Sequence, residues 1–200
     1  TENVTRKWLD NDYYVLTASA NYIKNKTRLD LGILLSKYIG DHFGTILWAQ
    51  TSGDILPRKK FYENQGNKNE KNFYAKLEQV LSNRINGFID LQYRKVNYDI
   101  NGILAGPRLF NVESKYGFFN PKAGLTYQMY NNQQIYLSYS KAQREPTRSD
   151  FENGNPKPEK LNNFELGWRI NKNSFYVYSN LYLMLYKDQL SLTGALDDVG

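Results

Sequence analysis

Apolar and polar residues alternate with a period of two along most of the chain. In the first such stretch, residues 13–24, Leu16 and Ala18 fall on one side of an extended backbone and Thr17 and Ser19 on the other. Alternation of this kind predicts β-strands with one apolar and one polar face. The pattern predicts about eight strands, at 13–24, 27–39, 72–81, 87–98, 119–130, 134–142, 162–170 and 174–186. Helical spacing is not sustained anywhere, so we predict an all-β fold.

The connections between these strands alternate between short and long. The short ones, at 25–26, 82–86, 131–133 and 171–173, are rich in Asn, which tolerates the left-handed backbone of hairpin turns. The long ones are at 40–71, 99–118 and 143–161, with an unfinished one after Lys187. This order predicts an antiparallel up-and-down meander whose long loops all lie at one edge. Outer-membrane β-barrels have this asymmetry; the alternative is a soluble antiparallel β-sandwich, an adhesion or glycan-binding module, which shows the same one-sided alternation.

Aromatic residues on the apolar faces favour the barrel. Tyr22, Tyr127 and Trp168 come shortly before short turns, whereas Tyr14 and Phe119 lie toward the long-loop ends. Amphipathic rings gather at both interfaces of a membrane, so two such girdles are expected of a transmembrane barrel.

Composition narrows the alternatives. The chain has 17 Tyr and 10 Phe but a mean hydropathy of −0.67, and no run of about 18 apolar residues. A transmembrane helix is therefore excluded, while barrel strands remain possible because their residues alternate. With no Cys and one His, the sequence predicts no disulfide, no thiolate chemistry, no metal cluster and no cofactor.

The charged residues argue against two further classes of protein, nucleic-acid-binding proteins and enzymes. The net charge of +6 comes from basic residues scattered along the chain, and 58–60 is their single tight cluster, so we expect no nucleic-acid partner. The acidic pairs Asp197/Asp198 and Glu63/Glu70 lie at a chain end and in a polar segment, without the apolar pocket that raises a catalytic carboxyl pKa. We therefore expect no enzymatic activity.

Five fragments between residues 119 and 190 carry a family resemblance. They are Phe119-Asn120-Pro121-Lys122-Ala123-Gly124-Leu125-Thr126-Tyr127, Ile135-Tyr136-Leu137-Ser138-Tyr139-Ser140, Arg144-Glu145-Pro146-Thr147-Arg148-Ser149-Asp150, Pro156 to Trp168 with its Glu165-Leu166-Gly167, and Tyr186-Lys187-Asp188-Gln189-Leu190. In this order they resemble the barrel strands of TonB-dependent outer-membrane receptors, and the composition is similar to receptors from Bacteroidetes. Residues 1–118 match the family in architecture and in the phrase at 90–94.

The resemblance implies a bacterial outer-membrane receptor for active uptake of a scarce nutrient: a ferric siderophore, haem, cobalamin, a glycan or a peptide. It implies four partners: a plug domain, a TonB-type energy-coupling protein, outer-membrane lipid and the nutrient ligand. The chain lacks the plug and holds about a third of the family's barrel of about 22 strands, so we expect an excised piece whose end strands are open and which transports nothing alone.

Two groups of residues are candidates for function. The resemblance implies that inward-facing charges contact the plug: Arg28, Asp90, Arg94, Arg144, Arg148 and Glu165. The alternative is a solvated face and, at 144–159, an ordinary proline-rich surface loop. Residues of the long loops that mix rings and cations are candidates for ligand contact, or else belong to ordinary extracellular loops: His42, Trp48, Arg58, Tyr62 and Arg108.

Overall fold

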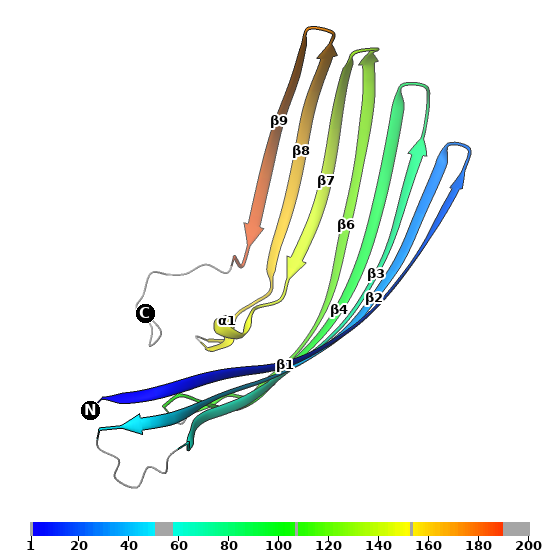
Figure 1. The fold of residues 1–200 in the computed structure, drawn as a ribbon. Helices are drawn as coiled ribbons and strands as arrows, with labels where there is room; N and C mark the ends of the chain where they lie inside the picture. Colours follow the sequence, from blue (N-terminus) through cyan, green and yellow to red (C-terminus); the bar gives the residue numbers. More distant parts are fainter. Residues whose placement is uncertain (1, 51–57, 107, 153, 190–200) are drawn as a thin grey trace. The chain divides into compact units, whose positions relative to one another are not determined.

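The computed structural model describes residues 2–50, 58–106, 108–152 and 154–189. In this part of the chain there are nine β-strands and one short helix (Figure 1). The elements are β1 (Asn3–Lys24), β2 (Thr27–Ala49), β3 (Lys60–Val80), β4 (Ile85–Leu104), β5 (Arg108–Leu109), β6 (Val112–Tyr130), β7 (Gln133–Arg144), α1 (Arg148–Glu152), β8 (Glu159–Lys172) and β9 (Phe175–Lys187). The predicted all-β fold is confirmed.

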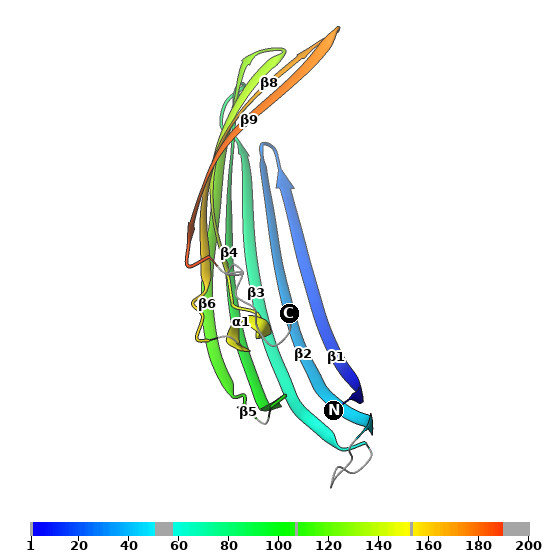
Figure 2. The same cartoon turned by 90° about the vertical axis from the view of Figure 1, so that its left-hand side faces the viewer.

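Hydrogen bonding links the strands in chain order, β1-β2-β3-β4-β6-β7-β8-β9, and the two-residue β5 pairs with β4. Figure 2 shows β5 as a short piece beside the end of β4. The pairs β6–β7, β7–β8 and β8–β9 are antiparallel, as predicted for an up-and-down meander. The sheet is open in the described residues, with β1 and β9 at the two ends of the order.

The short turns are where the sequence placed them. Asn25, in the turn between β1 and β2, has a φ of 52°. Its side chain can bond to the local backbone, which makes Asn one of the few residues that accept the left-handed region. The turn residues therefore predicted the hairpin.

The predicted long loops at 40–71 and 99–118 are wrong over most of their length. β2 continues to Ala49 and β3 begins at Lys60, while β4 runs to Leu104 and β6 begins at Val112. β1 likewise begins ten residues before the predicted 13–24. Within 143–161, by contrast, the predicted loop is present as the connection between β7 and β8, and it contains α1.

The extension of β3 was missed because it lacks an apolar face. Residues 60–71 of β3 are mostly Asn, Gln, Lys and Glu, and show no period-two pattern of hydrophobicity. Their backbone pairs with the neighbouring strand all the same, because N–H and C=O groups bond whatever the side chains are. Hydrophobic alternation reports burial or lipid contact, and a strand with polar residues on both faces gives no such signal.

The chain divides into two compact units. Unit 1 contains Thr1–Ala18, Ile33–Asn72 and Arg94–Gly117, and unit 2 contains Ser19–Gly32, Phe73–Tyr93 and Phe118–Gly200. Unit 1 has a small core in which Val96, Ile100, Leu104 and Phe110 are buried. Within it the side-chain amide of the buried Asn64 donates to the carbonyl of Ile103 at 3.2 Å.

In unit 2, the connection between β7 and β8 is ordered by its own polar groups. The Asp150 carboxylate accepts from both the backbone N–H and the hydroxyl of Thr147 at 2.7 Å, which caps the first turn of α1. Arg148 donates to Glu152 at 2.8 Å across that turn, and Phe151 is buried. No helix in the described part of the chain is long and apolar enough to cross a membrane.

Candidate functional site

The strands of unit 2 have two chemically different faces. Leu125 on β6 lies directly opposite Leu137 on β7, which lies directly opposite Leu166 on β8. All three side chains are exposed, at 52%, 57% and 47%. We call this the apolar face. In a protein surrounded by water, so continuous an exposed apolar row would be a liability, and its presence indicates contact with another apolar phase.

The opposite side, which we call the polar face, carries hydrogen-bonded and charged groups. Ser138 on β7 lies directly opposite Glu165 on β8, and Asn120 donates to the side chain of Gln92 at 3.2 Å. The Nδ2 of Asn163 donates to Glu165 at 2.7 Å, but its buried Oδ1 lacks a hydrogen-bond partner. The same is true of the buried Oδ1 of Asn180 on β9.

All four arginines predicted to contact the plug are paired with carboxylates of this chain. Arg28 bonds to the buried Asp30 at 3.0 Å, and Asn21 also donates to that carboxylate. Arg144 lies 3.1 Å from Glu159 across the β7–β8 pair. With Arg148 held by Glu152, three of the predicted arginines are paired within unit 2.

The remaining plug candidates are placed as follows. Arg94, in unit 1, donates to Glu70 through both Nε (2.6 Å) and Nη2 (2.9 Å), which forms a bidentate pair with both side chains largely buried. Asp90 is half-buried on β4, in unit 2.

Four of the five ligand-contact candidates lie on strands and not in a loop, which corrects their predicted setting. His42 and Trp48 lie on β2, Tyr62 on β3 and Arg108 on β5. Arg58 precedes β3 with a φ of 66°, in the left-handed region. All five belong to unit 1, and Trp48 is 53% exposed.

Near these residues lies a cluster of aromatic rings and cations that the sequence analysis predicted only in part. Trp8 on β1 stacks on Phe43 on β2, with ring centroids 6.3 Å apart. Arg6 lies 4.0 Å from the Trp8 ring centroid, and the Lys60 ammonium lies 4.6 Å from that of Phe43. Sequence reasoning had noted the basic cluster at 58–60, which contains Lys60, but not Arg6 and Trp8. The signal was available, because Trp8 and Phe43 are equally far from the Asn25-Lys26 turn and therefore face each other in the hairpin.

An exposed ion pair in unit 1 contributes less to stability than the largely buried Arg94–Glu70 pair. The Lys115 ammonium donates to Glu113 at 2.7 Å and lowers the pKa of that carboxyl below its usual value. A carboxylate with a lowered pKa stabilises the fold above the ordinary carboxyl pKa and stops doing so as the pH falls through its folded value. Both side chains are about two-thirds exposed, so solvent screens this contribution.

In the described part of the chain, no group of three or more His, Asp or Glu side chains could hold a metal ion.

The features that the structure does show are a sheet with an apolar face and a polar face, and a polar extension bearing rings and cations. Together they define an antiparallel meander of the membrane-barrel class.

Comparison with known proteins identifies the family. A family model described as "TonB dependent receptor-like, beta-barrel" matches residues 3–200. The chain therefore belongs to the TonB-dependent receptor β-barrel family. This is a family of receptors and transporters of the bacterial outer membrane, so the chain is part of an outer-membrane protein.

Solved structures share the fold at low sequence identity. The copper transporter OprC aligns with a TM-score of 0.74 and 14% identity over 91% of this chain and 31% of its own. The ferric citrate transporter FecA aligns with 0.67 and 14% identity over 97% of this chain and 31% of its own. The alcaligin receptor FauA from Bordetella pertussis aligns with 0.63 and 17% identity over 91% of this chain and 30% of its own. The chain thus spans less than a third of these structures, and a search of curated proteins by sequence finds no match.

Proposed function

We propose that this chain forms part of the barrel wall of a receptor that actively takes up a scarce nutrient: a ferric siderophore, haem, cobalamin, a glycan or a peptide. The family match over residues 3–200 carries the proposal. Solved structures of a copper transporter, a ferric citrate transporter and an alcaligin receptor share the fold and support this class of cargo. The protein performs no bond-making chemistry in this proposal.

The polar face would form the lumen wall against a plug domain. Arg28, Asp90, Arg94, Arg144, Arg148 and Glu165 remain the proposed contacts. An arginine already paired with a carboxylate keeps further N–H donors for a plug carbonyl, because its guanidinium has five. The unpartnered Oδ1 atoms of Asn163 and Asn180 favour an additional donor at this face, since buried polar atoms are normally bonded.

The ligand would contact unit 1. His42, Trp48, Arg58, Tyr62 and Arg108 combine ring faces with cations, which suits an anionic or aromatic cargo through stacking and cation–π contact. Energy would come from a TonB-type protein acting on the plug, so uptake should depend on that partner.

Uptake by cells that carry or lack the full-length receptor tests the proposal. Labelled ferric siderophores, haem, cyanocobalamin, oligosaccharides and peptides are supplied one at a time, with and without the TonB-type protein. We expect one class to enter only when both proteins are present, and replacement of Trp48 and Arg58 together by Ala to weaken its binding. Uptake of every class at the same rate without the receptor, or receptor-dependent uptake that persists without the coupling protein, would contradict active transport.

A further inference from the structure

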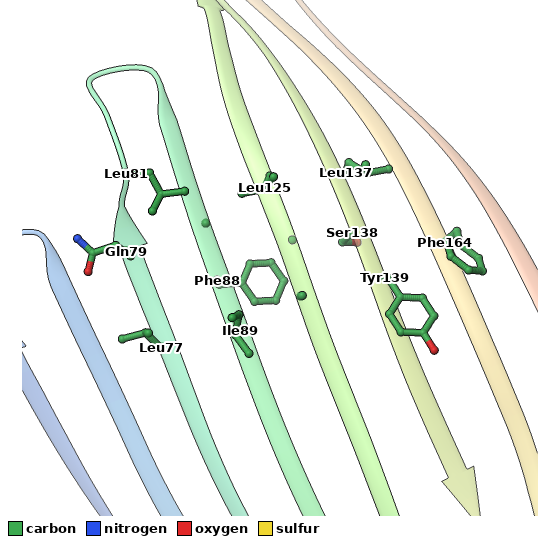
Figure 3. Close-up of a pocket in the computed structure, with 13 residues that line it drawn as sticks. Leu77, Gln79, Leu81, Phe88, Ile89, Leu125, Leu137, Ser138, Tyr139 and Phe164 are labelled. Atoms are coloured by element: carbon green, nitrogen blue, oxygen red, sulfur yellow. The ribbon is translucent and has the colours of Figure 1, made fainter.

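The apolar face of unit 2 contains a depression that crosses β3, β4, β6, β7 and β8 (Figure 3). Leu77, Leu81, Ile89, Leu125, Leu137 and Phe164 line it, and its volume is about 630 Å³. Pockets for small molecules and cofactors have volumes of about 300–1,000 Å³. The depression is therefore large enough to hold a ligand and is not merely a gap between two side chains.

Two small residues lie in its lining, Gly87 and Ala123. Gly87 on β4 has no side chain, and a Cβ there would lie 3.0 Å from Cδ2 of Leu125 and 3.3 Å from Cδ1 of Leu81. Ala123 on β6 lies directly opposite Tyr139 on β7 and contributes only a methyl group. Leu125 and Leu81 therefore already close over the backbone at Gly87, and a larger side chain at either small position would push into the depression.

The polar groups at the rim are already satisfied. The hydroxyl of Tyr139 donates to Asn162 at 2.9 Å, so the depression receives only its ring. The Oε1 of Gln79 accepts from Thr27 at 2.6 Å, and its Nε2 donates to the carbonyl of Val80 at 3.3 Å. An occupant would therefore find hydrocarbon contact and little hydrogen bonding, which excludes a polar nutrient and fits an alkyl chain.

We propose that this depression seats an acyl chain of an outer-membrane lipid. Family membership puts the exposed apolar face of the barrel in contact with the outer membrane, so lipid already covers the surface of which the depression is a part. Each methylene that enters it leaves the mobile bilayer for fixed contacts with Leu, Ile and Phe side chains. The site is independent of the nutrient and of the plug, and it keeps one lipid molecule bound to the receptor.

Filling the depression tests the proposal in the full-length receptor. Gly87→Leu and Ala123→Leu place a side chain in it, whereas Ala20→Leu adds the same bulk on the apolar side of β1, outside the lining. Lipid retained per receptor after detergent extraction is counted by native mass spectrometry, on protein shown to be folded by its heat-modifiable migration. Loss of contact with about two methylenes predicts approximately tenfold weaker lipid retention in the two filled variants. Lipid retention in Ala20→Leu should equal that of the wild type.

A photoreactive residue in place of Leu81, at the rim, identifies the occupant in native membranes. A cross-link to lipid supports the proposal. A cross-link to a protein, including a second copy of the receptor, would overturn it, as would lipid retention equal to wild type in both filled variants.

Discussion

At the residue scale, the polar face is shaped by aromatic rings that cover glycines on neighbouring strands. A glycine leaves backbone exposed, and a ring from the next strand covers it and gains contact area. A Cβ at each glycine would overlap the ring in the pairs Gly32/Tyr74, Gly124/Phe88 and Gly167/Tyr136. In the last pair the Tyr136 ring also stacks on Tyr178 of β9, with the two hydroxyls 2.7 Å apart, so one ring ties three strands together.

Gly167→Ala should therefore destabilise the folded receptor. The added methyl group displaces the Tyr136 ring and breaks its contact with Tyr178, and forced repacking of this kind costs about 1–3 kcal/mol. Gly66→Ala is the matched control, because no atom lies within 4 Å of a Cβ at that strand position. Urea unfolding of the full-length protein in detergent micelles compares the two variants. Equal urea midpoints would contradict the claim that packing of the Tyr136 ring requires a glycine at 167.

The sequence predicted which side of a strand each residue occupies but not these ring–glycine pairs. Parity along one strand follows from the period of two, as it did for Leu137 and Ser138. That Tyr136 covers Gly167 depends on the register between two strands whose connection is long. The pair of Arg94 on β4 with Glu70 on β3 likewise depends on the register between two strands.

At the element scale, β1 to β4 are far longer than a membrane requires. A barrel strand crosses the bilayer with about 9–11 residues, whereas these strands have 20 to 23. The surplus is held by backbone bonds and side-chain pairs, of which Arg94–Glu70 joins β4 to β3 with side chains only 18% and 16% exposed. The sequence could predict the apolar parts of these strands but not the surplus, because polar residues such as those at 60–71 are equally typical of loops.

Arg94→Gln should loosen this extension. It leaves the Glu70 carboxylate without its two charged donors, which costs about 1–2 kcal/mol for a partly screened pair. Lys115→Gln breaks the exposed Lys115–Glu113 pair and should leave stability unchanged. Hydrogen exchange of backbone amides in β3 and β4 measures the effect; similar exchange in both variants would mean that Arg94 does not hold the strands.

At the scale of the whole molecule, the described strands form an open sheet that corresponds to part of larger solved barrels. These strands run in order from β1 to β9 with both end strands open, and the chain spans about 30% of the solved barrels that share its fold. Edge strands expose rows of unpaired N–H and C=O groups, which in a bilayer must be paired within the protein. The remaining strands of the receptor would provide that pairing.

The two faces of β7 give the most direct measurement of whether this sheet is a membrane wall. The chain contains no cysteine, so single cysteines can be introduced within it at 135 through 140 in the full-length receptor, spin-labelled and placed in lipid bilayers. Accessibility to oxygen, which concentrates in lipid, should rise and fall with a period of two and be highest at Ile135, Leu137 and Tyr139. Equal accessibility of all six positions to a water-soluble nickel chelate, with no preference for oxygen at these three, would contradict the assignment of the apolar face to lipid.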